Sequence, residues 1–153
     1  MYKRLTIYSI ILIVIDQVIK LVVNSSLKLY ESITIIKNFF NITYVQNKGA
    51  AWSILSGNRF LLIGIAIIAL FLIFMFFIKD KKLSKLEIIF YSLLIGGIVG
   101  NFIDRVIYGY VVDYLDFNIF GYNFPIFNFA DICIVVSVIL ILIKSIKEEV
   151  CKK

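Results

Sequence analysis

The stretch NFPIFNFADICIVVSVILILIK, residues 123–144, joins an aromatic loop to a long apolar run, with one acid, Asp131, at the junction. Such a run predicts a helix inside a membrane, where an acid facing lipid is costly. The composition agrees, because 61% of the chain is hydrophobic and mean hydropathy is +0.98. A soluble domain is nearer half apolar. The position of Asp131 therefore requires an explanation.

The apolar runs set the architecture. The first three match the roughly 20 residues that a spanning helix needs, and the last is short but is extended by snorkelling lysines. The first run follows basic residues, as a cleaved signal peptide would. Asp16, Gln17 and Lys20 interrupt it and no A-x-A site follows, which favours a retained helix. We expect one integral membrane domain over residues 1–153, with four helices: residues 5–23, 60–78, 86–107 and 132–146.

Basic residues predict how the chain sits in the membrane. They gather at the chain start, between the second and third runs, and at the chain end, and an even number of spans puts all three groups on the cytoplasmic side. Residues 24–59 and 108–131 then lie outside, although the first of these also holds four basic residues. Both are rich in β-branched and aromatic residues broken by Gly, Asn and Pro. The expected fold is an all-α membrane protein with a small extracytoplasmic β-rich cradle.

Several classes of function are disfavoured by composition. The chain has no histidine, which argues against Ser-His and Cys-His catalysis and against His-ligated zinc. Cys133 and Cys151 lack metal-ligand spacing. The net charge of +6 is explained by membrane orientation, so we expect no nucleic-acid partner. We also expect no metal and no cofactor.

Polar residues inside the apolar runs converge on the outer half of the membrane. By depth, Asp16 and Lys20 lie beyond the middle of the first helix and on one face. Intramembrane ionisable groups usually mark function. A structural alternative stays open, in which Asp16 and Lys20 form an ion pair and Asp131 only stabilises a helix N-terminus. The other polar residues of this set lie in the outer turns of the third helix: Asn101, Asp104 and Arg105.

Five motifs in one order carry a resemblance to a known family. They are DQVIK (16–20), YVQNKGAAWS (44–53), GGIVGNFIDR (96–105), GYVVDYLDF (109–117) and FNFAD (127–131). Over nearly its whole length the chain resembles lipoprotein signal peptidase, the type II signal peptidase of bacteria. Each motif alone is weak, and the ordered set is specific. The main departure is Trp52, where phenylalanine is more usual; it keeps an aromatic side chain.

The resemblance implies an aspartic endopeptidase that cuts before a cysteine bearing diacylglycerol. It implies diacylglyceryl-modified prolipoproteins and membrane lipid as partners, and we expect a monomer. It also implies a place in the bacterial cytoplasmic membrane, with the active site toward the extracytoplasmic face. The catalytic aspartates correspond to Asp113 and Asp131, and the supporting residues are Asp16, Asn47, Asn101, Arg105 and Asn128.

The chemistry of such a pair can be argued from the residues. One carboxylate takes a proton from water, and the other, protonated, donates to the carbonyl oxygen. Asp131 at a helix N-terminus holds negative charge more readily than Asp113 in a loop, so we expect Asp131 to begin as the base. Asp116 lies three residues after Asp113 in a strand-like pattern and therefore points to the opposite face.

Other functions fit the residues less well. A small four-helix multidrug transporter would centre a carboxylate near the midplane, which only Asp16 provides, and Asp113 and Asp131 would go unexplained. A non-catalytic assembly subunit explains none of the motifs. A Ser–Lys protease would pair Lys20 with Ser9, which lies too far toward the cytoplasm, or with Ser53, which no motif supports.

Overall fold

The computed structural model describes residues 1–50 and 54–151, and four long helices dominate it. Within this part of the chain, four helices are long and apolar enough to cross a membrane, which confirms the predicted four-helix architecture. The last turn of the second span is π-helical and is labelled η2. The spans are α1 (Tyr2–Ser26), α2 with η2 (Arg59–Ile73 and Phe74–Ile78), α3 (Lys85–Ile107) and α4 (Phe129–Val150).

The start of α4 corrects the predicted boundary. The apolar run begins at Ile132, but the helix begins three residues earlier, at Phe129. Hydropathy marks where the sequence becomes apolar, whereas a helix starts where a side chain satisfies its first free N–H groups. Asn128 provides that cap. Residues 129–131 therefore belong to the helix and not to the outer β-rich segment.

The β-rich prediction is confirmed as a four-stranded antiparallel sheet with strands in sequence order. The strands are β1 (Ser32–Ile36), β2 (Phe40–Asn47), β3 (Val111–Ile119) and β4 (Tyr122–Asn123). The register between β2 and β3 shifts by one residue between Ile42 and Val45. One face of the sheet packs on the end of α1 through a buried cluster: Val23, Leu27, Tyr44, Val112 and Tyr114.

Helix α3 lies among the other helices, and its glycines allow close approach. A Cβ on Gly96 would lie 2.9 Å from Leu12 Cβ of α1. A Cβ on Gly97 would lie 2.5 Å from the carbonyl oxygen of Ala130 in α4. The backbone of α3 therefore packs directly on both neighbouring helices, as small residues permit in membrane proteins.

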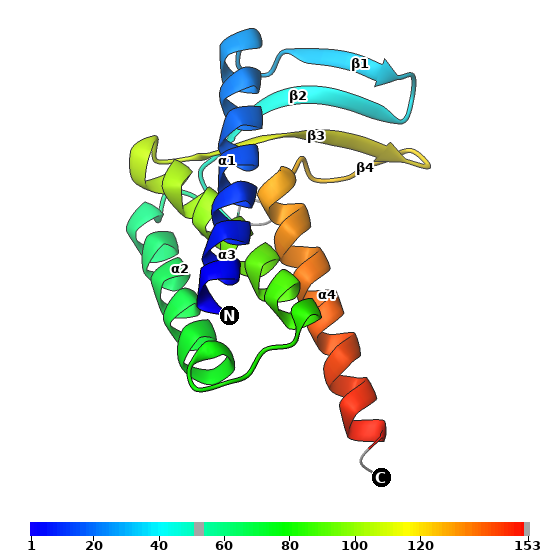
Figure 1. Ribbon diagram of the computed structural model, residues 1–153. Coiled ribbons are helices and arrows are strands. Elements are labelled where there is room, and N and C mark those ends of the chain that lie inside the picture. The colour runs from blue at the N-terminus through cyan, green and yellow to red at the C-terminus, as the bar shows by residue number, and fades with distance from the viewer. Residues whose placement is uncertain (51–53, 152–153) are drawn as a thin grey trace.

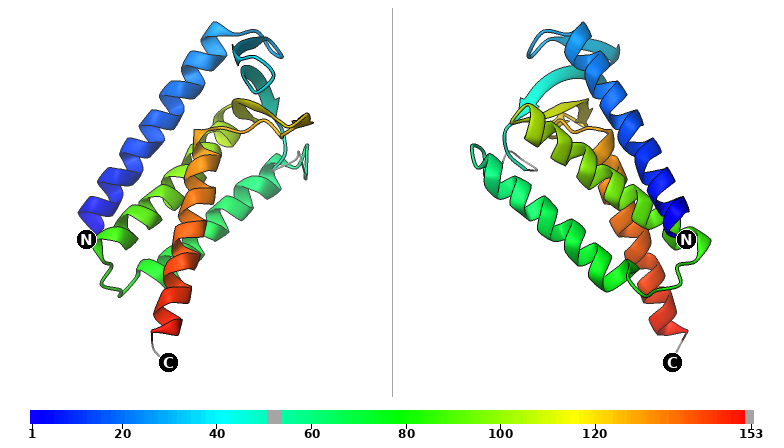
Figure 2. Two further views of the ribbon diagram at one scale, coloured as in Figure 1. Left: turned by 90° about the vertical axis from the view of Figure 1, so that its right-hand side faces the viewer. Right: turned by 60° about the vertical axis from the view of Figure 1, so that its left-hand side comes forward.

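The two ends of the helix bundle differ. The N-terminus, the α2–α3 connection and the C-terminal end of α4 lie at one end, and the sheet lies at the other (Figures 1 and 2). The basic residues that predicted the orientation belong to the first end, except that Lys152 and Lys153 lie outside the described residues. Which end faces the cytoplasm stays a prediction.

Candidate active site

The first turn of α4 is fixed by side chains from three elements. Asn128 Oδ1 accepts a hydrogen bond from Asp131 N at 3.0 Å, and Asp131 Oδ2 accepts one from Asn128 N at 3.1 Å. This capping box sets the direction of the Asp131 side chain. Phe129 N donates to the Tyr114 hydroxyl of β3, and Ala130 N donates to Asp16 Oδ1 of α1. Asp131 is therefore held rigidly at the sheet end of the helix.

Asp113 lies on β3 between two amide donors. Asn47 Nδ2 lies 2.9 Å from its Oδ2, and Asn128 Nδ2 lies 2.6 Å from its Oδ1. Its side chain is only 2% exposed. Burial, followed by the negative charge of Asp131, raises the pKa of Asp113 to about 7, and the two amide hydrogen bonds offset only part of this rise. Asp113 is thus poised to hold a proton near neutral pH.

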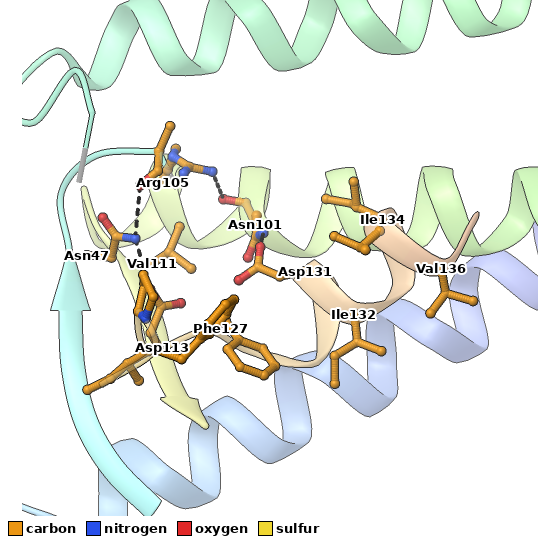
Figure 3. A pocket seen from close by; sticks show the side chains of 15 residues that line it. Asn47, Asn101, Arg105, Val111, Asp113, Phe127, Asp131, Ile132, Ile134 and Val136 are labelled. Atoms are coloured by element: carbon orange, nitrogen blue, oxygen red, sulfur yellow. Dashed lines mark hydrogen bonds between the residues drawn. The ribbon is translucent and has the colours of Figure 1, made fainter. Parts of the chain in front are cut away.

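Asn101 of α3 completes a link between the two acids. Its Nδ2 donates to Asp131 Oδ1 at 2.7 Å, and its Oδ1 accepts from Asn128 Nδ2 at 3.2 Å. Asp113 and Asp131 are therefore joined through the side chains of Asn128 and Asn101. Figure 3 shows both acids at the wall of the same pocket, one from β3 and the other from α4.

Arg105 approaches the pocket from the last turn of α3. Its Nη2 donates to the Gly49 carbonyl at 2.8 Å and its Nη1 to the Asn101 carbonyl at 3.3 Å. Its buried Nε has no hydrogen-bond partner among the described residues. Asn47 Oδ1 accepts from Gly49 N at 2.9 Å, so Asn47 and Arg105 together hold the turn that follows β2.

The pocket has a polar end and an apolar end. Its volume is about 480 Å³. Both acids, Asn47, Asn101 and Arg105 form the polar end. Most of the rest is apolar and lies along α4 and the loop before it, where several α4 side chains are exposed on the helix surface. These apolar residues include Phe124, Pro125, Phe127, Ile132, Val135 and Val136.

A second polar cluster lies behind the pocket and contains Asp16. Lys20 Nζ lies 2.8 Å from Asp16 Oδ2 and 3.0 Å from Asp104 Oδ2, so the Asp16–Lys20 ion pair that the sequence left open is present and extends to α3. Sequence reasoning did not single out Gln17 as part of the site, although its Nε2 donates to Asp104 Oδ1 at 2.9 Å. Its only sequence signal is its place beside Asp16. No group of three metal-ligating acids or cysteines occurs in residues 1–50 and 54–151.

The sequence matches the family described as signal peptidase (SPase) II over residues 8–147. The chain belongs to the signal peptidase II family. It is 45% identical to a lipoprotein signal peptidase of Staphylococcus aureus strain MRSA252, over 95% of this chain and 89% of that protein. Its counterpart from strain JH9 is 44% identical over the same shares.

Two solved structures share the fold of this chain. One, described as a bacterial membrane enzyme structure obtained by the in meso method at 2.3 Å resolution, superposes with a TM-score of 0.90 at 44% identity. That match covers 97% of this chain and 91% of the other. A second, similarly described at 1.9 Å, gives a TM-score of 0.83 at 44% identity over 94% and 92% of the two chains. The fold is therefore that of a known bacterial membrane enzyme.

The five sequence motifs meet around the pocket. Four of them supply the acids, amides and arginine described above, and DQVIK supplies the cluster behind them. The end of YVQNKGAAWS, including Trp52 and Ser53, lies outside the described residues. The transporter alternative gains no support, and Asp16, its one candidate carboxylate, is paired with Lys20.

Proposed function

We propose that this protein is a membrane aspartic endopeptidase that removes the signal peptide from diacylglyceryl-modified prolipoproteins, cutting before the lipidated cysteine. Membership of the signal peptidase II family makes it a protease of lipoprotein precursors. The observation that carries the aspartic type is the meeting of Asp113 and Asp131 in one pocket. Asn128 and Asn101 join the two acids. Two interacting carboxyl groups that share a proton suit this chemistry.

The proposed reaction begins with Asp113 protonated and Asp131 ionised. Asp131 takes a proton from a water molecule, whose oxygen attacks the scissile carbonyl carbon, while Asp113 donates its proton to the carbonyl oxygen. The tetrahedral diol then collapses, and one hydroxyl returns a proton to Asp113 as the carbonyl reforms. Asp131 gives its proton to the departing nitrogen as the C–N bond breaks. Each acid ends in its starting state, so the cycle needs no further group.

The supporting residues orient these groups. Asn101 and Asn128 direct hydrogens at the acids and keep their distance and direction fixed. Arg105 lines the pocket and donates to the Gly49 and Asn101 carbonyls, so it holds the turn after β2 beside the acids. Asn47 holds Asp113 and the turn beside it. Asp16 accepts from Ala130 N and so fixes the start of α4.

The apolar end of the pocket supports a lipidated substrate. Burial of an acyl chain contributes about 0.8 kcal/mol per methylene. Acyl chains in the outer leaflet would bring the modified cysteine to the depth at which α4 begins. We therefore assign the protein to the bacterial cytoplasmic membrane, with both termini in the cytoplasm and the sheet outside. One chain supplies every residue of the site, which supports a monomer.

The test is cleavage of a synthetic precursor by purified protein in detergent, with a chelator present and no proton gradient. One precursor carries diacylglycerol on the cysteine and its matched control carries a free cysteine. We expect the lipidated precursor to be cut, and mass spectrometry should give a product that begins with the modified cysteine. Equal cutting of both precursors would refute lipid recognition, and no cutting of either would refute the proposed activity.

A further inference from the structure

Lys20 lies at the centre of the polar cluster behind the pocket, where it donates to three side chains. Besides its contacts with Asp16 and Asp104, its Nζ lies 2.9 Å from Asn101 Oδ1. An ammonium has three hydrogens and no acceptor, so each hydrogen has one partner. The side chain is 3% exposed and does not line the pocket. Lys20 therefore acts on its neighbours and not on a substrate.

The contacts of Asn101 determine which way its amide faces. Its Oδ1 receives hydrogens from Lys20 and Asn128, and its Nδ2 donates to Asp131. If the amide rotated by half a turn, its oxygen would face the Asp131 carboxylate. Its NH₂ group would then face the ammonium of Lys20, which can only donate. The rotated form would lose all three hydrogen bonds, so the surroundings select one orientation.

Asn128 cannot fix this orientation as firmly by itself. Its side-chain oxygen is committed to Asp131 N, so its Nδ2 must serve both Asp113 and Asn101. Its contact with Asn101 is 3.2 Å, whereas the contact of Lys20 is 2.9 Å and charge-assisted. Lys20 is itself held in place by two carboxylates. Lys20 is thus the stronger of the two constraints on Asn101.

We infer that Lys20 is a positioning residue for the acid pair: it fixes the Asn101 amide so that Nδ2 points at Asp131. This inference rests on the proposed function, because it assigns a purpose to the orientation of Asp131. The competing explanation is that Lys20 only joins α1 to α3 through ion pairs. The two explanations differ in one measurable way, since only positioning makes the effect of Lys20 depend on Asn101.

The first experiment compares Lys20→Met with Lys20→Gln in detergent-purified protein. Met and Gln have side chains of equal length, each one atom shorter than that of Lys; Met has no donor, whereas Gln keeps an N–H for Asn101 and removes the charge. We expect Lys20→Met to lower kcat on the order of 10²-fold, as a small misplacement of a reacting group can do. We expect KM to stay near the wild-type value, and Lys20→Gln to recover a large part of kcat. Unchanged kcat in Lys20→Met would overturn the inference.

The second experiment is a double-mutant cycle with Asn101→Ala. If Lys20 acts through Asn101, the double variant should be about as slow as Asn101→Ala alone, because the lysine has no amide left to orient. Fold-losses that multiply would overturn the inference and leave Lys20 with a packing role. If Lys20→Met does not fold, Lys20→Leu, which likewise has no donor, takes its place in the cycle, and the same two outcomes decide.

Two controls complete the design. Lys28→Met changes an exposed lysine in the loop after α1 and should leave kcat and KM unchanged. Asp113→Asn and Asp131→Asn, measured in the same assay, test the proposed function separately. If both lack activity while Lys20 and Asn101 behave independently, only the positioning inference fails. If either keeps substantial activity, the aspartic mechanism itself fails.

Discussion

At the scale of single residues, the two acids of the pocket occupy unlike environments. Asp131 completes a helix cap and accepts from a backbone N–H and an amide. Asp113 is buried in a strand beside that charge, and its pKa is raised to about 7. Such a difference separates the roles of two chemically identical side chains. It supports the proposal in which Asp113 is the acid and Asp131 the base.

The two acids should be indispensable as a unit. Asp113→Asn and Asp131→Asn are nearly isosteric changes, but an amide can neither supply nor accept the proton. We expect each to lower the cleavage rate by at least about 10²-fold, since general acid–base catalysis contributes typically 10²–10⁴. The double variant should be scarcely slower than either single one. Initial rates on a lipidated precursor check this.

Asp116→Asn is the matched control. Asp116 lies on the same strand, but its carboxylate accepts hydrogen bonds from Thr43 at 2.7 Å and from Asn41. It forms no hydrogen bond with Asp113 or Asp131. Most of the activity should remain. An active Asp113→Asn enzyme, or an inactive Asp116→Asn enzyme that still folds, would contradict the assignment of the pair.

The pH dependence should report the proton on Asp113. Its pKa of about 7 lies above the ordinary value, so the acid form is present below that pH and kcat/KM should fall as pH rises through it. The hydrogen bond from Asn47 lowers this pKa, because it favours the ionised carboxylate. Asn47→Ala should therefore move the alkaline limb to higher pH, whatever it does to the maximal rate.

Asn24→Ala serves as the comparison for this pH profile. Asn24 is exposed on α1, so its substitution should leave the pH profile of kcat/KM unchanged. An alkaline limb that stayed fixed or moved to lower pH in Asn47→Ala would show that Asp113 does not set it.

At the scale of elements, the packing of α3 on α4 brings Asn101 to Asp131. Gly97 makes that packing possible, since a Cβ there would lie 2.5 Å from the Ala130 carbonyl oxygen and 2.7 Å from Ile134 Cγ1. Gly97→Ala should push the helices apart, lower the melting temperature in detergent and reduce cleavage. This should hold although alanine favours a helix over glycine by about 1 kcal/mol.

Gly64→Ala separates packing from helix propensity. Gly64 lies in α2, and a Cβ there would meet nothing within 4 Å. Its substitution should leave activity unchanged and keep or slightly raise thermal stability. If Gly97→Ala behaved in the same way, the close contact between α3 and α4 would be of no consequence.

The helices and strands also show which structural features can be predicted from the sequence alone. The long apolar runs located all four helices, because each run is long and is separated from the next by polar residues. They misplaced the start of α4, since Asn128 and Asp131 cap it and hydropathy does not register caps. The N-x-x-D spacing was a usable signal. No sequence signal marked the register shift between Ile42 and Val45, because the shift depends on pairing with a strand some 70 residues away.

The same limit applies to the site. The resemblance of five motifs identified the acids and amides that line the pocket. It did not indicate that Gln17 would reach Asp104, or that Lys20 would contact Asn101, since both contacts join residues more than 80 positions apart. Contacts of this kind arise only when α1 packs on α3.

At the scale of the whole molecule, the sheet lies at one end of the helices, and the N-terminus and the C-terminal end of α4 lie at the other (Figure 1). The positive-inside rule then predicts that the sheet is outside the cell membrane. Single cysteines at Lys82, in the α2–α3 connection, and at the exposed Phe120, in the β3–β4 turn, test this in a background lacking Cys133 and Cys151. An impermeant thiol reagent applied to intact cells should label position 120 and spare position 82. The reverse pattern would place the pocket on the cytoplasmic side.

The helix cap that contains Asp131 has a consequence for how this protein tolerates change. At positions 128 and 131, selection for folding and selection for cleavage favour the same residues, because one end of each side chain makes the cap and the other end contacts the acid pair. Asp113 is different: its raised pKa means that the folded chain loses stability as pH rises from about 4 to 7. Directed evolution for thermostability alone would therefore retain Asn128 and Asp131 and discard Asp113.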